Sequence, residues 1–312
     1  MAVPNVVWLS SPAATTFPAH MNRNFDYHRA SSPEDAIRLK ALLGGNARFW
    51  AGGTDLMLWD RRKDNPITAA IDITALKELS GIEVSGNRIR IGALASLTLL
   101  ERSGHRHLNL RVLAGTARLM CTPQTRTIAS IGGNVCNASP GADLLPPLVA
   151  LGAKVRLQGA RGTRIATLEQ FITGVGQNDL GSDEMLTHIE IENNDSRSAA
   201  VYQRVARTAV DIALVSSAVY LGMGDDGKVA AARISLGAVT ARPIRCSTAE
   251  ERLVGETLTE GRIAEAAQRA AEYASPISDI RASKEYRSKM CAVLTRRCIE
   301  NCMSEINRKA AA

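Results

Sequence analysis

Apolar and polar positions change their pattern repeatedly along the first half of the chain, so helices and strands are expected to alternate there. The stretch SSPEDAIRLKALLGG (31–45) predicts a helix, with Ser32 as the cap, Pro33 as the first helical residue and Gly44-Gly45 as the stop. The stretch GIEVSGNRIRIGAL (81–94) predicts a hairpin, because both flanks alternate and its Gly-Asn pair accepts positive φ. Further strands are expected in ARFW (47–50), ITAAIDIT (67–74) and KVRLQG (154–159), and further helices in LRVLAGTARLMC (110–121) and ADLLPPLVALGA (142–153).

The second half changes character after the polar stretch IENNDSRSAA (191–200). Residues 199–246 offer three long apolar strands with a turn at Asp225-Asp226-Gly227, and three helical segments follow, ending near Ile306. This order predicts an antiparallel sheet that helices cover on one face. A separate unit is therefore expected to begin near residue 198.

Composition excludes several classes of protein. With 312 residues, 45% of them hydrophobic and 22% charged, the chain is long and apolar enough for two or three packed domains. The net charge of +7 is scattered, and only four Phe, five Tyr and three Trp could stack on bases, so a nucleic-acid partner is not expected. No apolar run reaches the roughly 20 residues that span a bilayer, and the first residues lack the basic start of a signal peptide.

The six cysteines are expected to be reduced thiols of a cytoplasmic protein, because the chain shows no secretory signal. Cys291, Cys298 and Cys302 recur at helical spacing, which favours core packing over metal ligation. His105 and His107 have no third ligand nearby, so they are assigned to a solvated loop. No metal site is predicted.

The candidate ligand-binding elements are two glycine pairs, each of which follows an apolar stretch. AGGTDL (51–56) and SIGGN (130–134) could each let a backbone approach a ligand closely, and their N–H groups could surround a pyrophosphate. Neither has the Gly-x-Gly-x-x-Gly spacing of a Rossmann turn or the Gly-Lys-Ser/Thr ending of a Walker loop. A dinucleotide would therefore be bound in another way.

Four segments, in order and spacing, resemble the FAD-binding subunit of molybdenum hydroxylases, the family of xanthine dehydrogenase and carbon monoxide dehydrogenase flavoproteins. They are AGGTDL (51–56), PQTRTIASIGGNVCNASPGADLLPPLVALGAKV (123–155), VYQRVARTAVDIALVSSAV (201–219) and GAVTARPIRC (237–246). The resemblance implies an α+β fold: a two-lobed FAD-binding domain of the p-cresol methylhydroxylase type at 21–197 and a smaller domain at 198–306. Residues 1–20 are expected to be a disordered extension and 307–312 a tail.

The resemblance also assigns a noncovalent FAD site residue by residue. Ala51, Gly52, Gly53, Thr54, Asp55, Leu56 and Met57 would form the first pyrophosphate loop, and Ser130, Ile131, Gly132, Gly133 and Asn134 the second. Asp143 aligns with an aspartate near the flavin, although a residue that favours a helix start explains it equally well. Met120, Leu186 and Gln203 complete the implied site: Met120 stands where animal enzymes have an aromatic, and Gln203 where a lysine is common.

The implied activity is electron relay within an oxidoreductase complex. A large molybdopterin-binding subunit and a small 2Fe-2S subunit would be the partners, in a dimer of heterotrimers, and NAD or another acceptor would take the electrons. FAD would be the one cofactor on this chain. Two alternatives remain open: a flavin-free scaffold subunit, and a self-contained flavin oxidase of the same fold, for which no acid/base group of His, Tyr and Arg can be assigned.

Overall fold

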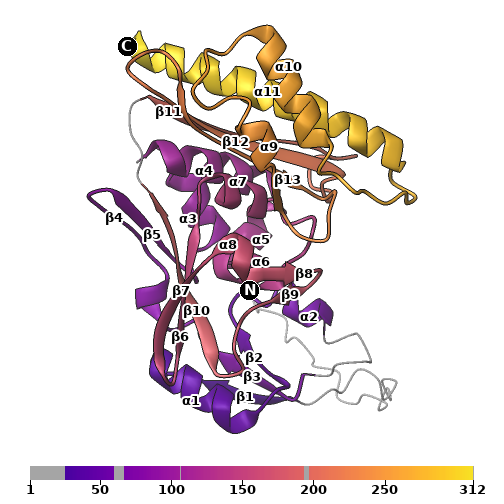
Figure 1. Cartoon of the computed structure of the whole chain (residues 1–312). Helices are drawn as coiled ribbons and strands as arrows, with labels where there is room; N and C mark the ends of the chain where they lie inside the picture. The colour runs from indigo at the N-terminus through magenta and orange to yellow at the C-terminus, as the bar shows by residue number, and fades with distance from the viewer. Residues whose placement is uncertain (1–24, 60–66, 106, 193–196, 312) are drawn as a thin grey trace, which may run out of the picture.

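The computed structural model describes residues 25–59, 67–105, 107–192 and 197–311. The chain forms three parts that follow one another along one long axis. The N-terminal lobe lies at one end, a central lobe in the middle, and the C-terminal domain at the other end (Figure 1). The fold is α+β, as the sequence predicts. The expected extension at 1–20 lies outside the described residues.

The N-terminal lobe is a small parallel sheet of order β1-β3-β2 covered by one helix. Its elements are β1 (Asp26–Arg29), α1 (Pro33–Leu43), β2 (Ala47–Trp50), α2 (Leu56–Trp59), β3 (Ala69–Asp72) and the short 3-10 helix η2 (Lys77–Leu79). The expected cap is present, because the Ser32 hydroxyl accepts a hydrogen bond from the Asp35 N–H at 3.1 Å. Strands β2 and β3 run parallel with Trp50 opposite Asp72, so both end at the same edge of the sheet.

The central lobe is a five-stranded sheet of order β4-β5-β10-β6-β7, packed against helices. Its strands are β4 (Ile82–Ser85), β5 (Arg88–Gly92), β6 (Lys154–Gly159), β7 (Gly162–Thr167) and β10 (Glu184–Glu192), with the small pair β8 (Ile172–Gly174) and β9 (Gln177–Asn178) beside them. The hairpin β4-β5 turns at Gly86, whose φ is +53°, as predicted. The helices are α3 (Leu97–Arg102), α4 (Leu108–Leu119), α5 (Pro123–Ile128), α6 (Ile131–Asn137), α7 (Leu145–Ala150) and α8 (Leu168–Phe171).

Several helices of this lobe differ from the sequence prediction. Helix α7 covers only Leu145–Ala150 of the helix expected over 142–153, and α3, α5 and α8 were not predicted. Helix α4 ends at Leu119, before the predicted Met120 and Cys121, because Met120 is extended and Cys121 has a φ of +49°. The segment from Ile131 to Asn137, expected as part of a loop, is helix α6. Its cap is Ser130, whose hydroxyl accepts from the Gly133 N–H at 3.1 Å.

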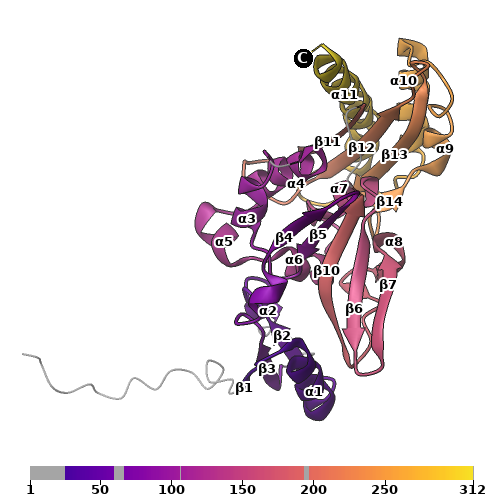
Figure 2. The ribbon, with the colours of Figure 1, turned by 90° about the vertical axis from the view of Figure 1, so that its left-hand side faces the viewer.

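The C-terminal domain is an antiparallel sheet of order β11-β12-β13-β14 with helices on its outer face (Figure 2). Its elements are β11 (Ser198–Val205), β12 (Val215–Met223), β13 (Val229–Gly237), β14 (Ile244–Arg245), α9 (Ser247–Glu250), α10 (Glu260–Ala271) and α11 (Lys284–Ala310). Helix α11 continues to Ala310, so residues 307–310 are helical where the sequence predicts a tail. The inner face of the sheet packs on α4 and α7 of the central lobe.

Side chains on β11 alternate between two hydrophobic cores. Ala199 and Val201 pack in the core under α10 and α11, whereas Ala200 and Tyr202 pack against the core of the central lobe. The three cysteines of α11 are buried in the first of these cores, and their thiols donate to the carbonyls of Arg287, Ser217 and Val219. Their predicted packing role is confirmed.

Candidate functional site

The first glycine pair lies in an open loop directly after β2. Gly53 has a φ of +66°, a left-handed conformation that glycine adopts without strain. A Cβ atom on Gly52 would lie 2.0 Å from the carbonyl oxygen of Ile128, so the loop touches the end of α5. The backbone N–H groups of residues 51–55 have no acceptor among the described residues. This row of free donors is suited to an anion such as a pyrophosphate.

The second glycine pair lies inside the short helix α6 and has no free donors. The four N–H groups that follow Ser130 all donate to protein oxygens: Ile131 to Ala95 O, Gly132 to Ala93 O, Gly133 to Ser130 Oγ and Asn134 to Ser130 O. A Cβ atom on Gly132 would lie 2.6 Å from the Ala93 oxygen. The glycine therefore allows α6 to pack closely on the segment after β5. In the second loop, the Ser130 side chain remains available to a ligand, and so does the Ser130 N–H, which has no acceptor among the described residues.

A cavity of about 390 Å³ lies between the two glycine pairs. It is lined by Trp50, Ala51, Gly52, Thr74, Ser80, Leu94, Ser96, Thr127, Ile128 and Ser130. Three of these residues, Ala51, Gly52 and Ser130, were assigned to the site from the sequence. The others were not, although one signal was present: Thr74 follows β3, and the ends of neighbouring parallel strands share one edge.

Asp143 is buried and bonded to the C-terminal domain. Its two carboxylate oxygens accept from Tyr202 Oη at 2.5 Å and from Arg204 Nη1 at 2.7 Å, and both partners come from β11. Burial raises the pKa of this carboxyl, while the hydrogen bonds and charge of the two partners lower it. Arg204 also donates to the carbonyls of Leu119 and Ala209, so the ion pair links three segments. Asp143 precedes α7 by two residues and makes no capping bond there.

The Cys121 thiol feels charges from both this ion pair and the first loop. Cys121 is partly buried, and the charges of Asp55 and Asp143 both act on it, after burial, to raise its pKa. The Asp55 side chain is exposed at its surface, but partial desolvation raises the pKa of its carboxyl as well.

The remaining assigned residues do not line the cavity. Met120 and Leu186 are buried in the core of the central lobe, and the Met120 carbonyl accepts from Arg126 at 2.9 Å. Gln203 lies between Tyr202 and Arg204 on β11, so the alternation of the strand turns it toward α11 and away from Asp143. Arg204, which the sequence did not single out, is the cation that reaches Asp143.

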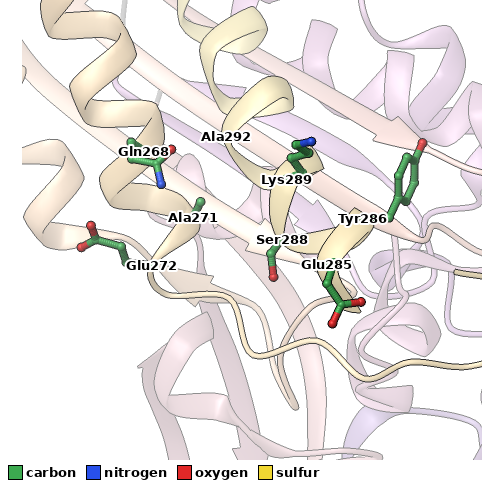
Figure 3. A pocket seen from close by; sticks show the side chains of 8 residues that line it. All are labelled: Gln268, Ala271, Glu272, Glu285, Tyr286, Ser288, Lys289 and Ala292. Carbon is green, nitrogen blue, oxygen red and sulfur yellow. The ribbon is translucent and has the colours of Figure 1, made fainter. Parts of the chain in front are cut away.

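A larger hollow of about 620 Å³ lies elsewhere, between α10 and α11 (Figure 3). It is lined by Gln268, Ala271, Glu272, Glu285, Tyr286, Ser288, Lys289 and Ala292. Neither glycine pair contributes to it, and it lies on the outer surface of the C-terminal domain. The smaller cavity is the candidate site because backbone donors and hydroxyl groups converge there.

In the described ranges no three His, Cys, Asp or Glu side chains come close enough to hold an ion. Within the same ranges, no helix has both the length and the apolar composition needed to cross a membrane.

Two family models divide the chain at the point where β10 gives way to β11. Residues 23–192 match the FAD binding domain in molybdopterin dehydrogenase, and residues 200–302 match the CO dehydrogenase flavoprotein C-terminal domain. The fold is thus that of an FAD-binding flavoprotein. The chain belongs to the family of FAD-binding subunits of molybdenum hydroxylases, and is an oxidoreductase subunit.

Curated relatives match over almost their whole length. The carbon monoxide dehydrogenase medium chain of Afipia carboxidovorans is 32% identical over 277 residues, which cover 89% of this chain and 96% of the relative. The putative xanthine dehydrogenase FAD-binding subunit of Escherichia coli K12 is 29% identical, with 91% and 97% covered.

Solved structures of the same family have the same fold. A chain of carbon monoxide dehydrogenase from Hydrogenophaga pseudoflava matches with a TM-score of 0.86 at 28% identity, covering 90% of this chain and 98% of that one. A chain of quinoline 2-oxidoreductase from Pseudomonas putida 86 matches with a TM-score of 0.84 at 27% identity, covering 91% and 98%.

The residues around the cavity fit the diphosphate and sugar part of FAD. The first loop supplies free N–H donors, and none of the described residues that line the space is charged. Five of them carry a hydroxyl group: Thr74, Ser80, Ser96, Thr127 and Ser130. Hydroxyls and backbone amides are common phosphate and ribose ligands. The fit rests mainly on the first loop, because the N–H groups of the second pair are already bonded.

Proposed function

We propose that this chain is the electron-transfer subunit of a heteromeric molybdenum hydroxylase. Electrons would arrive from the 2Fe-2S clusters of a small partner subunit, and a large molybdopterin-binding subunit would oxidise the substrate. NAD or another acceptor would receive the electrons. The observation that carries this proposal is the cavity beside the free N–H groups of residues 51–55, in a chain that covers 96% of a carbon monoxide dehydrogenase medium chain.

FAD supplies a redox centre that accepts electrons one at a time and releases them in pairs. The chain's own residues bind and orient it. In this proposal residues 51–55 donate N–H groups to the diphosphate, and Ser96 and Ser130 contribute hydroxyls from the facing wall. The buried pair of Asp143 and Arg204 holds the C-terminal domain against the central lobe. It thereby fixes the region where the flavin ring is expected.

The test is purification of the full chain together with whatever it carries. We expect one FAD per chain, released completely into solution on denaturation, because noncovalent contacts alone hold it. Co-purification with a large molybdenum subunit and a small iron-sulfur subunit would distinguish the relay from a self-contained oxidase. A colourless chain that does not take up added FAD would contradict the proposal and favour a scaffold subunit.

The predicted dimer of heterotrimers, the cytoplasmic location and the domain limits 21–197 and 198–306 remain parts of this proposal. Mass measurement of the purified assembly tests the first. Limited proteolysis tests the domain limits, since cleavage should fall between β10 and β11.

A further inference from the structure

The connection between α10 and α11 contains a tight turn that holds an isoleucine in solvent. Ile280 is 100% exposed, although burial of an isoleucine side chain is favourable. The Asp279 N–H donates to the Ala282 carbonyl at 3.1 Å, which closes the turn around Ile280. Asp279 Oδ1 accepts from the N–H groups of Arg281 and Ala282 at 2.8 and 3.2 Å. The position of Ile280 is therefore fixed by backbone and side-chain bonds.

The same turn is bonded to the helix that follows it. Asp279 Oδ1 also accepts from Arg287 Nη2 at 2.7 Å, and Arg287 is buried in α11. The Lys284 N–H, at the start of α11, donates to Ser278 Oγ at 2.9 Å. A flexible loop loses conformational entropy when a partner binds it, and this turn has already lost much of that entropy on folding. Ile280 is thus presented to solvent in a preorganised position.

The connection exposes further apolar side chains and few unpaired charges. Ile277 is 69% exposed and Tyr286 is 44% exposed, and Tyr286 lies beside the hollow between α10 and α11 (Figure 3). The charges on either side of Ile280, those of Asp279 and Arg281, pair with each other at 2.8 Å. Exposed apolar groups with a polar rim are typical of protein–protein contacts. The connection therefore suits an apolar, uncharged protein face.

Hydrogen bonds link this turn to the ion pair of Asp143 and Arg204. Arg287 also donates to the Leu214 carbonyl at 3.4 Å, directly before β12. The loop that ends at Leu214 supplies two carbonyls to Arg204, which pairs with Asp143. In the proposed function the flavin ring is expected in the region of this ion pair, and electrons pass efficiently between redox centres only over short distances. The subunit that delivers electrons is therefore the partner expected at this end of the C-terminal sheet.

We propose that Ile280, with Ile277 and Tyr286 beside it in the sequence, is the anchor on which the small 2Fe-2S subunit docks, through an apolar and uncharged pocket of that subunit. This inference rests on the proposed function, which supplies the iron-sulfur subunit as the partner. Ile280 acts on assembly in this assignment and does not contact FAD.

The test compares Ile280→Asp and Ile280→Val with the unchanged full chain, each tagged and purified from the cells that make its partner subunits. Iron and FAD are measured per chain. A carboxylate is unfavourable in an apolar pocket, and an anchor residue contributes much of the binding, so Ile280→Asp should lower the co-purified iron by at least about tenfold. FAD per chain and the melting temperature should not change, because the side chain is fully exposed. Ile280→Val keeps an apolar side chain and should retain most of the iron.

Leu42→Asp is the matched control, because Leu42 is 72% exposed on α1 in the N-terminal lobe, at the other end of the molecule. It should leave iron and FAD per chain unchanged. Unchanged iron in Ile280→Asp would overturn the inference, and so would loss of the large subunit while the small one stays bound. A purified chain that is a dimer, and that Ile280→Asp converts to a monomer, would identify a second copy as the occupant. An unchanged chain that brings no iron-sulfur subunit with it would instead overturn the proposed function.

Titration with the separately purified small subunit gives a second, independent reading. Calorimetry with the FAD-loaded full chain should show a dissociation constant that Ile280→Asp raises by at least about tenfold. A several-fold increase in salt concentration should change the dissociation constant of the unchanged chain by less than about twofold, because an apolar contact is not screened. A dissociation constant that rises steeply with salt, and that Ile280→Asp does not change, would contradict an apolar anchor.

Discussion

The two glycine pairs have the same sequence and serve different purposes. Gly52-Gly53 lies in an open loop, where Gly53 has a left-handed φ and the N–H groups of residues 51–55 are free. Gly132-Gly133 lies in helix α6 outside the left-handed region, and every N–H from Ile131 to Asn134 is bonded to the protein. In the first pair, glycine provides backbone freedom, and the loop's N–H donors are not bonded to the described residues. In the second, it provides space for close packing.

The two pairs are nevertheless coupled through the residues between them. Gly52 touches the carbonyl of Ile128, two residues before Ser130, and Ser96 bridges to Ser130. Beyond α6 the chain continues to Asp143, which is bonded to Tyr202 and Arg204. The second pair is therefore anchored at both ends, while the first loop has one side open. Substitutions in the second should mainly reduce stability, and those in the first should mainly reduce FAD affinity.

The largest expected effect is that of Gly132→Val. Its Cβ would lie 2.6 Å from the Ala93 oxygen and would break the bond that the Gly132 N–H donates there. We expect a loss of more than about 3 kcal/mol in unfolding free energy, measured by urea denaturation of the apoprotein. Gly115→Ala is the control, because nothing lies within 4 Å of that position in α4. It should be neutral or stabilising. An unchanged midpoint for Gly132→Val would show that α6 is not packed as described.

Asp143→Asn should have the next largest effect. It leaves Arg204 buried beside a neutral amide, so we expect a cost of about 2 to 3 kcal/mol in unfolding free energy. A residue that only favours a helix start would cost about 0.3 to 1 kcal/mol.

Two further measurements separate the roles of Asp143. In a double variant, Asp143→Asn with Arg204→Met should recover part of the stability, since no unpaired charge then remains. Reductive titration of the bound flavin tests proximity to the ring, because loss of a nearby negative charge raises the midpoint potential. A cost below about 1 kcal/mol, with no recovery in the double variant, would argue against the ion pair.

Much of the fold follows from local sequence signals. The Ser32 cap, the Gly86 hairpin and the three cysteines of α11 were predictable because capping, turn chemistry and helical spacing act over a few residues. The ends of α4 and α11 were less predictable. At the end of α4, Arg126 donates to the carbonyls of Met120 and Cys121, and Arg204 donates to that of Leu119. These contacts form only in the folded protein, so the sequence pattern does not show where the helix ends.

The candidate site was predictable only in part, for a related reason. Glycine pairs can be read in a sequence, but whether their N–H groups are free depends on partners such as Ala93 and Ala95, which lie almost 40 residues away. The cavity hydroxyls come from several separate segments, so no single motif contains them. Arg204 reaches Asp143 because its face of β11 is turned toward the central lobe. The sequence pattern alone did not determine which of Gln203 and its neighbours lie on that face.

In the first loop, Gly53→Ala should mainly reduce FAD affinity, whereas substitutions in the second pair mainly reduce stability. A φ of +66° costs a non-glycine residue about 1 to 2 kcal/mol, and the new Cβ would also meet the Trp50 ring. The loop should relax to a different conformation, with FAD affinity reduced by at least about tenfold, which corresponds to about 1.4 kcal/mol. Equilibrium dialysis with FAD and a melting curve give the two values. Gly45→Ala, where nothing lies within 4 Å, is the control and should affect neither.

The smallest expected effect, that of Ser130→Ala, asks whether the second pair contributes anything to the ligand. The Ser130 hydroxyl accepts from the Gly133 N–H and also lines the cavity, so it has one structural and one potential binding role. Loss of the cap should cost about 1 kcal/mol in unfolding free energy. If Ser130 also contacts FAD, the dissociation constant should rise as well, by a few-fold, because one hydrogen bond contributes about 1 kcal/mol. Ser130→Thr keeps a hydroxyl at the cap and should restore most of the stability, so it separates the two roles. If Ser130→Ala lowers stability but leaves FAD affinity unchanged, the Ser130 hydroxyl is a structural cap alone and does not contact the ligand.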